Sequence, residues 1–347
     1  MRDINIYALD NQLNMIAILK PTNIQWSRKY YENGYFSILL PLEQYSKEIA
    51  YIYTPDRPET GRVTQINYIS EGHSFYVSIS GWFLERDLND FTVNPNKTTL
   101  TELSGSAEWV ASEYVRLFSE GIDNIITGER GKLSIDTFNG EFLDNKVHNI
   151  LKPSEMSYRV SFDFLTNKKT WLAYQGVDRT HSQTQNNFII FSTKYGNIKN
   201  PNIVISEDMY KNSALIKFNP SAGEDYKFFE HTPNPIVFPD RKRQVMIDCR
   251  DTFRNDYQNE EEFMRALKAE AEQELTNNYS RVINTEFDAL NGSYEYMEDF
   301  DLGDKCDVEI PEIGFSEEVR LTGVYEVVKF GQISISLEFG DQTLLKW

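Results

Sequence analysis

The chain has 347 residues, of which 40% are hydrophobic, so its length suits several packed modules and its composition suits a globular interior. Its 35 Lys and Arg residues and 53 Asp and Glu residues leave a net charge of −18. This acidity argues against a protein that binds nucleic acid by neutralising phosphates, and against one that binds an anionic membrane surface.

The N-terminal part of the chain is predicted to consist of strands and tight turns. Apolar and polar residues alternate within each expected strand, and Asp, Asn and Gly residues mark the turns. Pro41 ends one strand, because proline cannot donate a hydrogen bond to a neighbouring strand. The expected strands are residues 3–9, 13–19, 24–30, 35–40, 61–69 and 75–81. Short strands of this kind indicate a barrel or sandwich, so we predict a β-barrel-like domain over residues 1–98.

The middle of the chain is predicted to mix helices with strands. Ser106 can cap a helix that runs to about residue 119, and Asn259 can cap a helix that runs to about residue 278. Apolar residues recur at helical spacing in both segments, and a third, short helix is expected over residues 146–151. We therefore predict a mixed α/β domain over residues 99–205. Strands and the long helix over residues 206–285 complete this middle region.

The C-terminal part is predicted to return to strands. Alternating residues indicate strands at 306–310, 319–330 and 333–339, the last two as a hairpin with one buried face. The predicted fold class is therefore α+β and β-rich. Two β-barrel-like domains, at residues 1–98 and 286–347, are joined by the mixed α/β region. A loose similarity between residues 61–64 and 319–322 favours duplicated barrels.

Catalytic, cofactor-binding and metal-binding residues are not predicted, and we expect no enzymatic activity. The four histidines, His73, His148, His181 and His231, do not form a zinc-hydrolase motif. Asp178, His181 and Ser182 lie too close in sequence for their side chains to converge as a triad. The acidic segment at residues 299–304 fails the EF-hand pattern, because Asp304 stands where that loop needs glycine.

Three further features have structural interpretations. Cys249 and Cys306 lie in strand-like segments and are expected to be buried thiols. The basic cluster Arg241-Lys-Arg243 is expected at a strand end, paired with acidic neighbours. The chain shows neither an apolar signal-peptide segment at Met1 nor a run of about 18 apolar residues, so we expect synthesis in a reducing cytoplasm and no membrane anchoring.

Three segments together resemble the siphophage tail-tip hub family, which is the N-terminal structural module of tail-associated lysin proteins and is akin to the baseplate hub of contractile tails. The most specific is Tyr174-Gln-Gly-Val-Asp-Arg-Thr180, followed by Phe191-Ser192, Asn197 and Lys211-Asn212. The second runs from Gly61-Arg-Val-Thr to Leu88, and the third contains Leu302-Gly-Asp304, Arg320-Leu-Thr-Gly-Val324 and Phe339-Gly340. The chain departs from the family at Asn89-Asp90, where two arginines are common.

The resemblance implies a phage baseplate hub-like fold and a homotrimer that closes the distal end of the tail tube at the virion tail tip. It implies contacts with the distal tail protein ring and with the tape-measure protein terminus. Because Trp347 follows soon after Gly340, we expect a lysin or receptor-binding protein to be a separate chain. DNA is expected only in transit, and synthesis is expected in the bacterial host's cytoplasm. The particle is a phage, a defective prophage or a tail-derived bacteriocin.

Two alternative functions stay open at this point: a cell-wall-degrading enzyme of the tail, either endopeptidase or glycoside hydrolase, and a receptor-binding adhesin. With 53 acidic residues the sequence cannot select a carboxylate pair for glycoside hydrolysis. The net charge also has two interpretations. The acidic residues either line a channel that repels passing DNA, or they are spread evenly over the surface and promote solubility.

Overall fold

A computed structural model describes residues 6–341 except 101, 222–223, 238, 251, 291–292 and 330–331. The chain forms two compact units. The first contains residues up to 134, residues 138–202 and residues 285–339, so both ends of the chain contribute to it. The second consists chiefly of residues 203–284.

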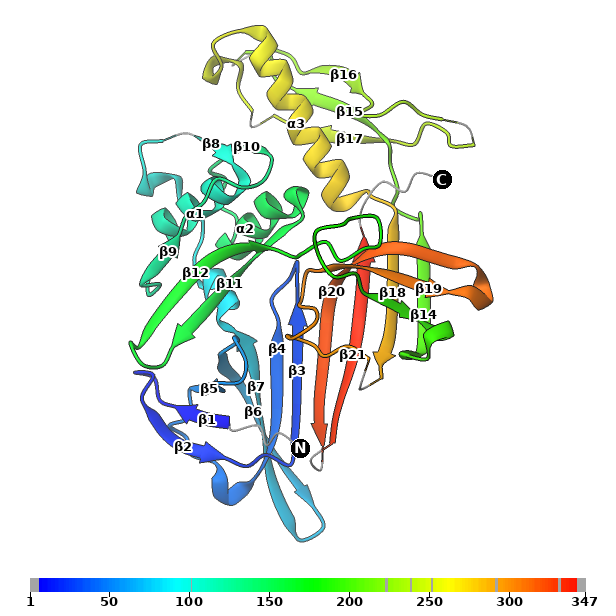
Figure 1. Ribbon diagram of the computed structural model, residues 1–347. Coiled ribbons are helices and arrows are strands. Elements are labelled where there is room, and N and C mark those ends of the chain that lie inside the picture. Colours follow the sequence, from blue (N-terminus) through cyan, green and yellow to red (C-terminus); the bar gives the residue numbers. More distant parts are fainter. Residues whose placement is uncertain are drawn as a thin grey trace. The chain divides into compact units, whose positions relative to one another are not determined.

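The first unit is built on one large, mainly antiparallel sheet (Figure 1). Its main strand order is β14-β18-β21-β20-β3-β4-β7-β6-β5-β1-β2, with β19 on β20 and β13 on β19. The strands from the N-terminal part are β1 (Ile6–Leu9), β2 (Met15–Leu19), β3 (Asn23–Lys29), β4 (Tyr35–Pro41), β5 (Tyr51–Tyr53), β6 (Gly61–Glu71) and β7 (Ser74–Phe83). Those from later in the chain are β13 (Ile190–Ser192), β14 (Ile198–Ser206), β18 (Val282–Ala289), β19 (Lys305–Ile310), β20 (Phe315–Lys329) and β21 (Gln332–Asp341).

The two ends of the chain meet at the antiparallel pair of β3 and β20, where Arg28 lies opposite Val324. The expected hairpins β1–β2, β6–β7 and β20–β21 are confirmed, although residues 3–5, 330 and 331 lie outside the described part. The described pairings form an open path and close no ring, so the two β-barrel-like domains stay a prediction. The four predicted domain boundaries likewise stay predictions.

A second layer of the first unit contains two helices and a three-stranded sheet. Helix α1 (Ala107–Phe118) and helix α2 (Leu143–Leu151) pack with β11 (Met156–Asp163) and β12 (Lys168–Gln175), and β9 (Asn124–Ile126) pairs with β12. The helix predicted from Ser106 is confirmed, because the Ser106 hydroxyl accepts a hydrogen bond from Trp109 N–H. The expected short helix begins three residues earlier than predicted, at Leu143. Two further strands are β8 (Glu102–Ser106) and β10 (Leu133–Thr137).

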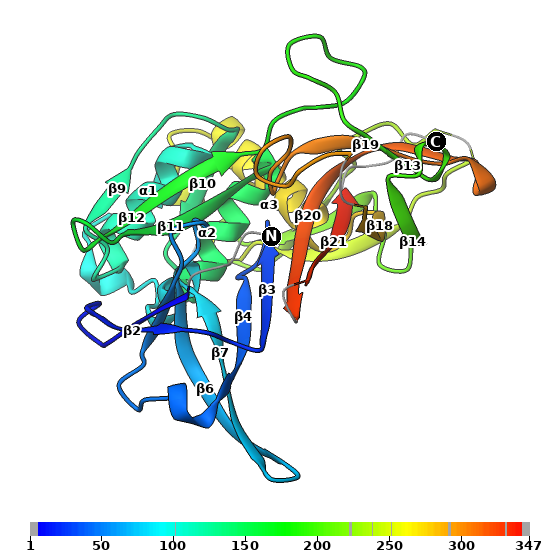
Figure 2. The ribbon, with the colours of Figure 1, turned by 60° about the horizontal axis from the view of Figure 1, so that its bottom comes forward.

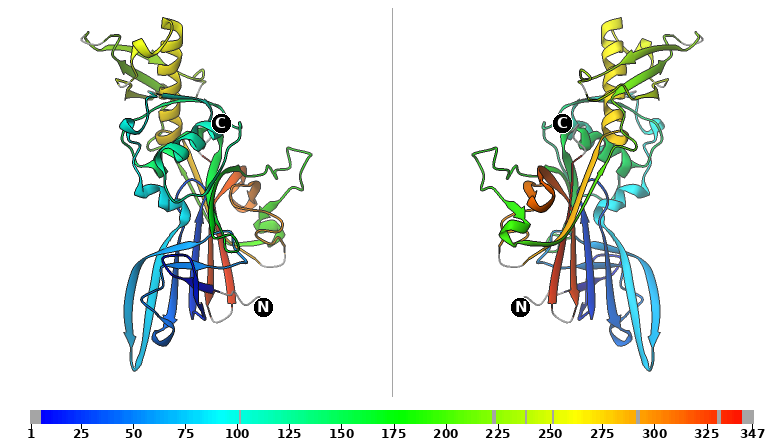
Figure 3. Two further views of the ribbon diagram at one scale, coloured as in Figure 1. Left: turned by 90° about the vertical axis from the view of Figure 1, so that its left-hand side faces the viewer. Right: turned by 90° about the vertical axis from the view of Figure 1, so that its right-hand side faces the viewer.

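The second unit places one helix on a small sheet. Strand β15 (Ser213–Phe218) lies between β16 (Lys227–His231), which is antiparallel to it, and β17 (Gln244–Asp248), which is parallel. Helix α3 (Glu260–Asn278) runs alongside these strands (Figure 3). The buried apolar residues of this unit include Ile216, Ile247, Phe263, Leu267 and Ala271.

Helix α3 begins as predicted. The Asn259 side chain accepts a hydrogen bond from Glu262 N–H at 2.9 Å, and the Glu262 carboxylate accepts one from Gln258 N–H at 3.2 Å. The first bond satisfies an N–H group at the start of the helix, which has no partner within it, and the second links the residue before the N-cap to the first turn.

Short 3₁₀ helices connect several of these elements. They are η1 (Leu42–Gln44), η2 (Leu84–Asp90), η3 (Pro95–Lys97), η4 (Lys152–Ser154), η5 (Thr193–Tyr195), η6 (Arg254–Asp256) and η7 (Pro311–Ile313). Within the described residues, no helix is both long enough and apolar enough to span a membrane.

Candidate functional site

The most specific sequence segment, residues 174–180, folds against residues 302–305. Asp304, which is 2% exposed, accepts hydrogen bonds from Val177 N–H at 2.7 Å and from Arg179 Nε at 2.6 Å. Backbone bonds from Lys305 N–H to Val177 and from Arg179 N–H to Lys305 complete the contact. Two of the three segments that carried the resemblance are therefore one structural junction.

Glycines let the two backbones approach closely at this junction. A Cβ atom on Gly176 would lie 1.7 Å from the carbonyl oxygen of Gly303, which no side chain tolerates. Gly303 itself has a φ of +94°, in the region that favours glycine. The two glycines of these segments, Gly176 and Gly303, are thus explained by packing.

Tyr30 joins this junction to the N-terminal strands. Its hydroxyl accepts a hydrogen bond from Gly176 N–H at 3.2 Å and donates one to the Glu155 carbonyl at 2.9 Å. Arg320 donates to the Gly303 carbonyl at 2.5 Å and pairs with the Glu155 carboxylate. Sequence patterns do not indicate Tyr30 or Glu155 as members of this junction, because their partners lie more than a hundred residues away.

The remaining residues of the same sequence segment also support the fold. Phe191 lies within ring-centroid distances of 5.3–5.6 Å of Phe287, Tyr294, Phe300 and Phe339. The Asn197 amide accepts from Ser192 N–H and donates to the Ile190 carbonyl, which holds the turn between β13 and β14. Asn212 makes similar bonds to Arg241 and Arg243 in the second unit.

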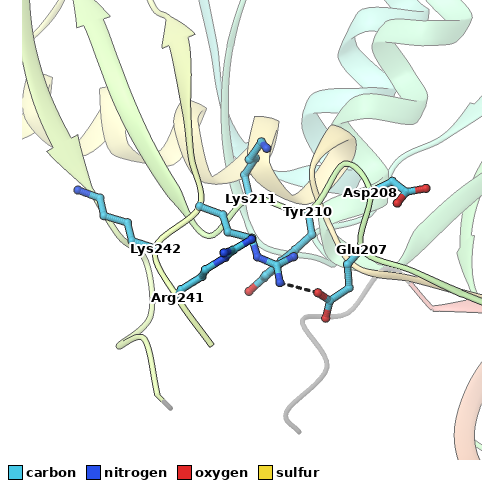
Figure 4. Close-up of a pocket in the computed structure, with 7 residues that line it drawn as sticks. Glu207, Asp208, Tyr210, Lys211, Arg241 and Lys242 are labelled. Carbon is cyan, nitrogen blue, oxygen red and sulfur yellow. Dashed lines mark ion pairs between the residues drawn. The ribbon is translucent and has the colours of Figure 1, made fainter. Parts of the chain in front are cut away.

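A hollow of about 640 Å³ lies in the second unit beside the predicted basic cluster (Figure 4). In that view Arg241 and Lys242 lie on one side, and Glu207 and Asp208 lie on the other. The residues that line it are Glu207, Asp208, Tyr210, Lys211, Arg241, Lys242 and Arg243. A small-molecule pocket is usually apolar with a few polar groups, and this charged lining differs from one.

Several charges around the hollow are already paired. Arg243 lies 2.6 Å from Glu207, and Lys242 pairs with Glu230. Arg281 contacts both Glu207 and Asp240 at 2.9 Å. Burial opposes the charge of Asp240, but the N–H of Arg241 and the charge of Arg281 outweigh burial and lower the pKa of Asp240. The expected pairing of the basic cluster with acidic neighbours is confirmed for Lys242 and Arg243.

Two of the four histidines pair with a carboxylate. His231 contacts Glu272 at 2.7 Å, and His181 contacts Asp307 at 2.8 Å. His148 is buried beneath Tyr158, and burial lowers its pKa to about 4. Neither ring nitrogen of His148 has a hydrogen-bond partner among the described residues. The Asp178 carboxylate accepts from Thr180, so residues 178–182 do not assemble a triad.

One group of side chains has the composition of a metal site. Ligand atoms of His181, Asp307 and Glu318 lie within 4.8 Å of one another. The hydrogen bond to Asp307 is the main cause that raises the pKa of His181. Sequence spacing could not indicate this group, because Asp307 is 126 residues from His181.

The two cysteines are buried free thiols, as predicted. Burial is the main cause that raises the pKa of both Cys249 and Cys306. A thiol of raised pKa is a poor nucleophile and a poor metal ligand.

Residues 3–341 match the family described as Siphovirus ReqiPepy6 Gp37-like protein. The chain belongs to this siphovirus family. No curated protein sequence matches it. The sequence-based resemblance to siphophage proteins is confirmed at the level of this family.

Solved structures show which fold this family member adopts. It is similar to the tail protein from Neisseria meningitidis MC58, with a TM-score of 0.61 and 13% identity over 99% of this chain and 98% of that one. It is similar to the 43 kDa tail protein of prophage MuSo2 from Shewanella oneidensis, with a TM-score of 0.60 and 12% identity over 96% and 98% of the two chains. It is also similar to prophage tail protein gp18 from Listeria monocytogenes EGD-e, with a TM-score of 0.55 and 14% identity over 97% of this chain and 94% of that one. The β-rich fold is therefore that of phage tail proteins.

Proposed function

We propose that the chain is a structural hub at the tip of a phage or phage-derived tail. The observation that carries the proposal is the similarity to the N. meningitidis tail protein, which extends over 99% of this chain and 98% of that one. A shared fold over the whole length fits a shared structural role. The packing roles of residues 174–180 and 302–305 support the same conclusion, because the most specific residues of the chain position its backbone.

The hub would act as a homotrimeric ring that closes the distal tail tube, with two barrel-like domains from each subunit. Strand β6 offers an edge for such an interface. It pairs with β7 along its length but with β5 only at Gly61 and Arg62. The β6–β7 hairpin extends beyond the strands next to it (Figure 2), and Ile66, Tyr68 and Phe75 on it are 43%, 60% and 59% exposed. An unpaired apolar edge favours pairing with another chain.

Reconstructed tail tips test the ring directly. We expect three copies of the chain around the tail axis, and a ring of any other copy number contradicts the homotrimer. The double variant Ile66→Lys/Tyr68→Glu should lose assembly and keep its melting temperature, because both side chains are exposed in the single chain. Leu165→Lys is the matched control, since Leu165 is 92% exposed on a turn elsewhere.

The proposed partners are the distal tail protein ring, the tape-measure protein terminus and a lysin or receptor-binding protein as a separate chain. Co-expression followed by affinity purification tests each of them. Recovery of the distal tail protein in a fixed ratio supports the hub. An adhesin would instead remain bound to purified host cell walls without either tail partner.

We propose no enzymatic activity for the chain. The Asp178 carboxylate accepts from Thr180, and both cysteines are buried thiols of raised pKa. Purified chain incubated with peptidoglycan should therefore release no muropeptides. Turnover that persists through purification contradicts the proposal and favours a cell-wall-degrading enzyme.

The net charge of −18 suits a channel that DNA crosses without binding. Lysine and arginine in the bore would hold phosphates, whereas an acidic wall would repel them. An electrostatic map of the assembled ring decides between this arrangement and an even distribution of charge. Binding of duplex DNA at about 0.15 M salt, where the screening length is about 8 Å, contradicts an acidic bore.

A further inference from the structure

Strands β19 and β20 bring two carboxylates to the same place. In their antiparallel register Asp307 lies directly opposite Glu318, so both side chains are on one face of the pair. Asp307 is 4% exposed, and Glu318 is partly buried. Like charges directly opposite one another destabilise a sheet, so a cation bound between them would stabilise this pair.

His181 contacts Asp307 of this pair through both its backbone N–H and its ring. The Asp307 carboxylate accepts from His181 N–H at 2.8 Å through one oxygen and contacts the ring Nδ1 at 2.8 Å through the other. The loop that carries His181 is held by Gln183, which bonds to Thr180 and Asn186. The ring is therefore presented by an ordered loop while its outer face stays open to solvent.

We propose that His181, Asp307 and Glu318 form a binding site for a divalent cation of the zinc class. The three ligand atoms lie within 4.8 Å of one another, and two ligands of one tetrahedral zinc lie about 3.4 Å apart. Small rotations of the exposed His181 and partly buried Glu318 side chains close the difference. One nitrogen and two carboxylate ligands suit zinc, whereas calcium takes six or more oxygens.

Binding would replace a hydrogen bond with coordination. The proton shared between Nδ1 and Asp307 leaves to solvent, and the metal takes both atoms as ligands. Three protein ligands leave room for water in the remaining position. The cation would attach the loop after Val177 to strands β19 and β20, next to the junction that Asp304 makes with Val177 and Arg179.

Calorimetric titration of the untagged chain with Zn²⁺ tests the site. We expect one ion per chain. Removing a residue that only hydrogen-bonds a metal ligand weakens metal binding at least about tenfold, so removing the ligand itself in His181→Ala should weaken binding by about tenfold or more. Glu318→Gln should act in the same direction. His231→Ala is the control and should leave Zn²⁺ binding unchanged. His231 also contacts a carboxylate, that of Glu272, but among the described residues only His181 belongs to a group of three possible ligands.

A second variant separates metal binding from charge balance. His181→Lys keeps a positive charge beside Asp307 and Glu318 but removes the ring nitrogen, so it should fold and fail to bind. Zn²⁺ should raise the melting temperature of the natural chain and leave that of His181→Lys unchanged. Co²⁺, used as a visible probe, should show absorption bands that His181→Lys lacks. Absence of binding in the natural chain, or equal binding by His181→Lys, overturns the proposal and leaves His181 as an ion-pair partner.

Discussion

The two units of this protein differ in how far apart along the chain their buried charged partners lie. The second unit, chiefly residues 203–284, has a core of aromatic and aliphatic residues such as Phe218, Phe263 and Leu267. The first unit also buries a network of charges where strands from the two ends of the chain pair. Arg28 is 1% exposed and Glu326 is 2% exposed, yet they come from strands almost three hundred residues apart.

This network connects segments that local sequence patterns cannot connect. Arg28 lies 3.1 Å from both Glu59 and Glu326, and Arg57 contacts the other oxygen of Glu326 at 2.5 Å. The charged neighbours raise the pKa of Arg28 although burial opposes this. A buried charge without its partner is costly, so each member disfavours any arrangement that lacks the others. Buried charges in the first unit therefore join the two ends of the chain, whereas the buried Arg281 of the second unit pairs with Glu207 and Asp240 of the same contiguous segment.

The largest effect is expected from Arg28→Met, which removes the central cation and leaves Glu59 and Glu326 buried. It should lower the free energy of unfolding of the first unit by about 3–5 kcal/mol. Hydrogen exchange resolved by peptide measures each unit separately, and peptides within residues 203–284 should keep their protection. Arg116→Met is the control, because Arg116 is 51% exposed in its pair with Glu113 and its loss should change little. Equal losses in both units contradict the comparison.

Gly303→Ala should also weaken the first unit. A Cβ atom there would lie 2.3 Å from the Tyr30 ring, and the hydrogen bonds of the Tyr30 hydroxyl prevent that ring from moving away. Gly121→Ala is the matched control, since Gly121 has a φ of +74° and nothing within 4 Å of an added Cβ. Both variants pay about 1–2 kcal/mol for the backbone conformation. Gly303→Ala should lose about 1–3 kcal/mol more, measured by chemical denaturation.

Buried titratable groups should give the first unit two opposing pH dependences. The pKa of His148 is lowered to about 4 by burial, so its contribution to stability is complete above its usual value of 6.5 and is lost as pH falls towards 4. The pKa of Glu85 is raised to about 7, chiefly by burial, so its contribution is lost as pH rises from 4.5 to 7. Each effect amounts to at most about 3 kcal/mol.

The two effects cancel in part in the natural chain, so variants are needed to see them. His148→Leu should become more stable relative to the natural chain as pH falls from 6.5 to 4. Glu85→Gln should become more stable relative to it as pH rises from 4.5 to 7. Denaturant midpoints at several pH values measure both trends. Parallel pH profiles for the two variants contradict the assigned protonation states.

The smallest effect is expected from Asn259→Ala, which removes the N-cap of helix α3. It should cost about 1 kcal/mol and increase exchange at the first amides of α3, with no change in the first unit. Asn94→Ala is a suitable control, because Asn94 caps only the single-turn helix η3. A loss of protection in β3 or β20 would show that the two units do not unfold independently.

Sequence patterns predicted the elements that depend on neighbouring residues. Ser106 and Asn259 begin helices because their side chains accept from N–H groups three residues later, which is a local geometry. The β6–β7 hairpin follows from alternation around the turn at Gly72 for the same reason. Because Arg28 lies two residues after Trp26 on an alternating strand, the pattern indicates that its side chain faces inward. The pattern does not indicate that Glu59 and Glu326 are its partners.

The sequence by itself determined the helices that begin after Ser106 and Asn259, the hairpins β1–β2, β6–β7 and β20–β21, the burial of both cysteines, and the family to which the chain belongs. Only the tertiary structure decided that β3 pairs with β20 and that the Asp304 carboxylate accepts hydrogen bonds from Val177 and Arg179. It also decided that His181 lies beside Asp307 and Glu318. The physical reason is that alternation specifies which face of a strand is buried and leaves its neighbour unspecified. The neighbour is chosen by contacts between residues far apart in the chain, such as a buried charge and its counterion.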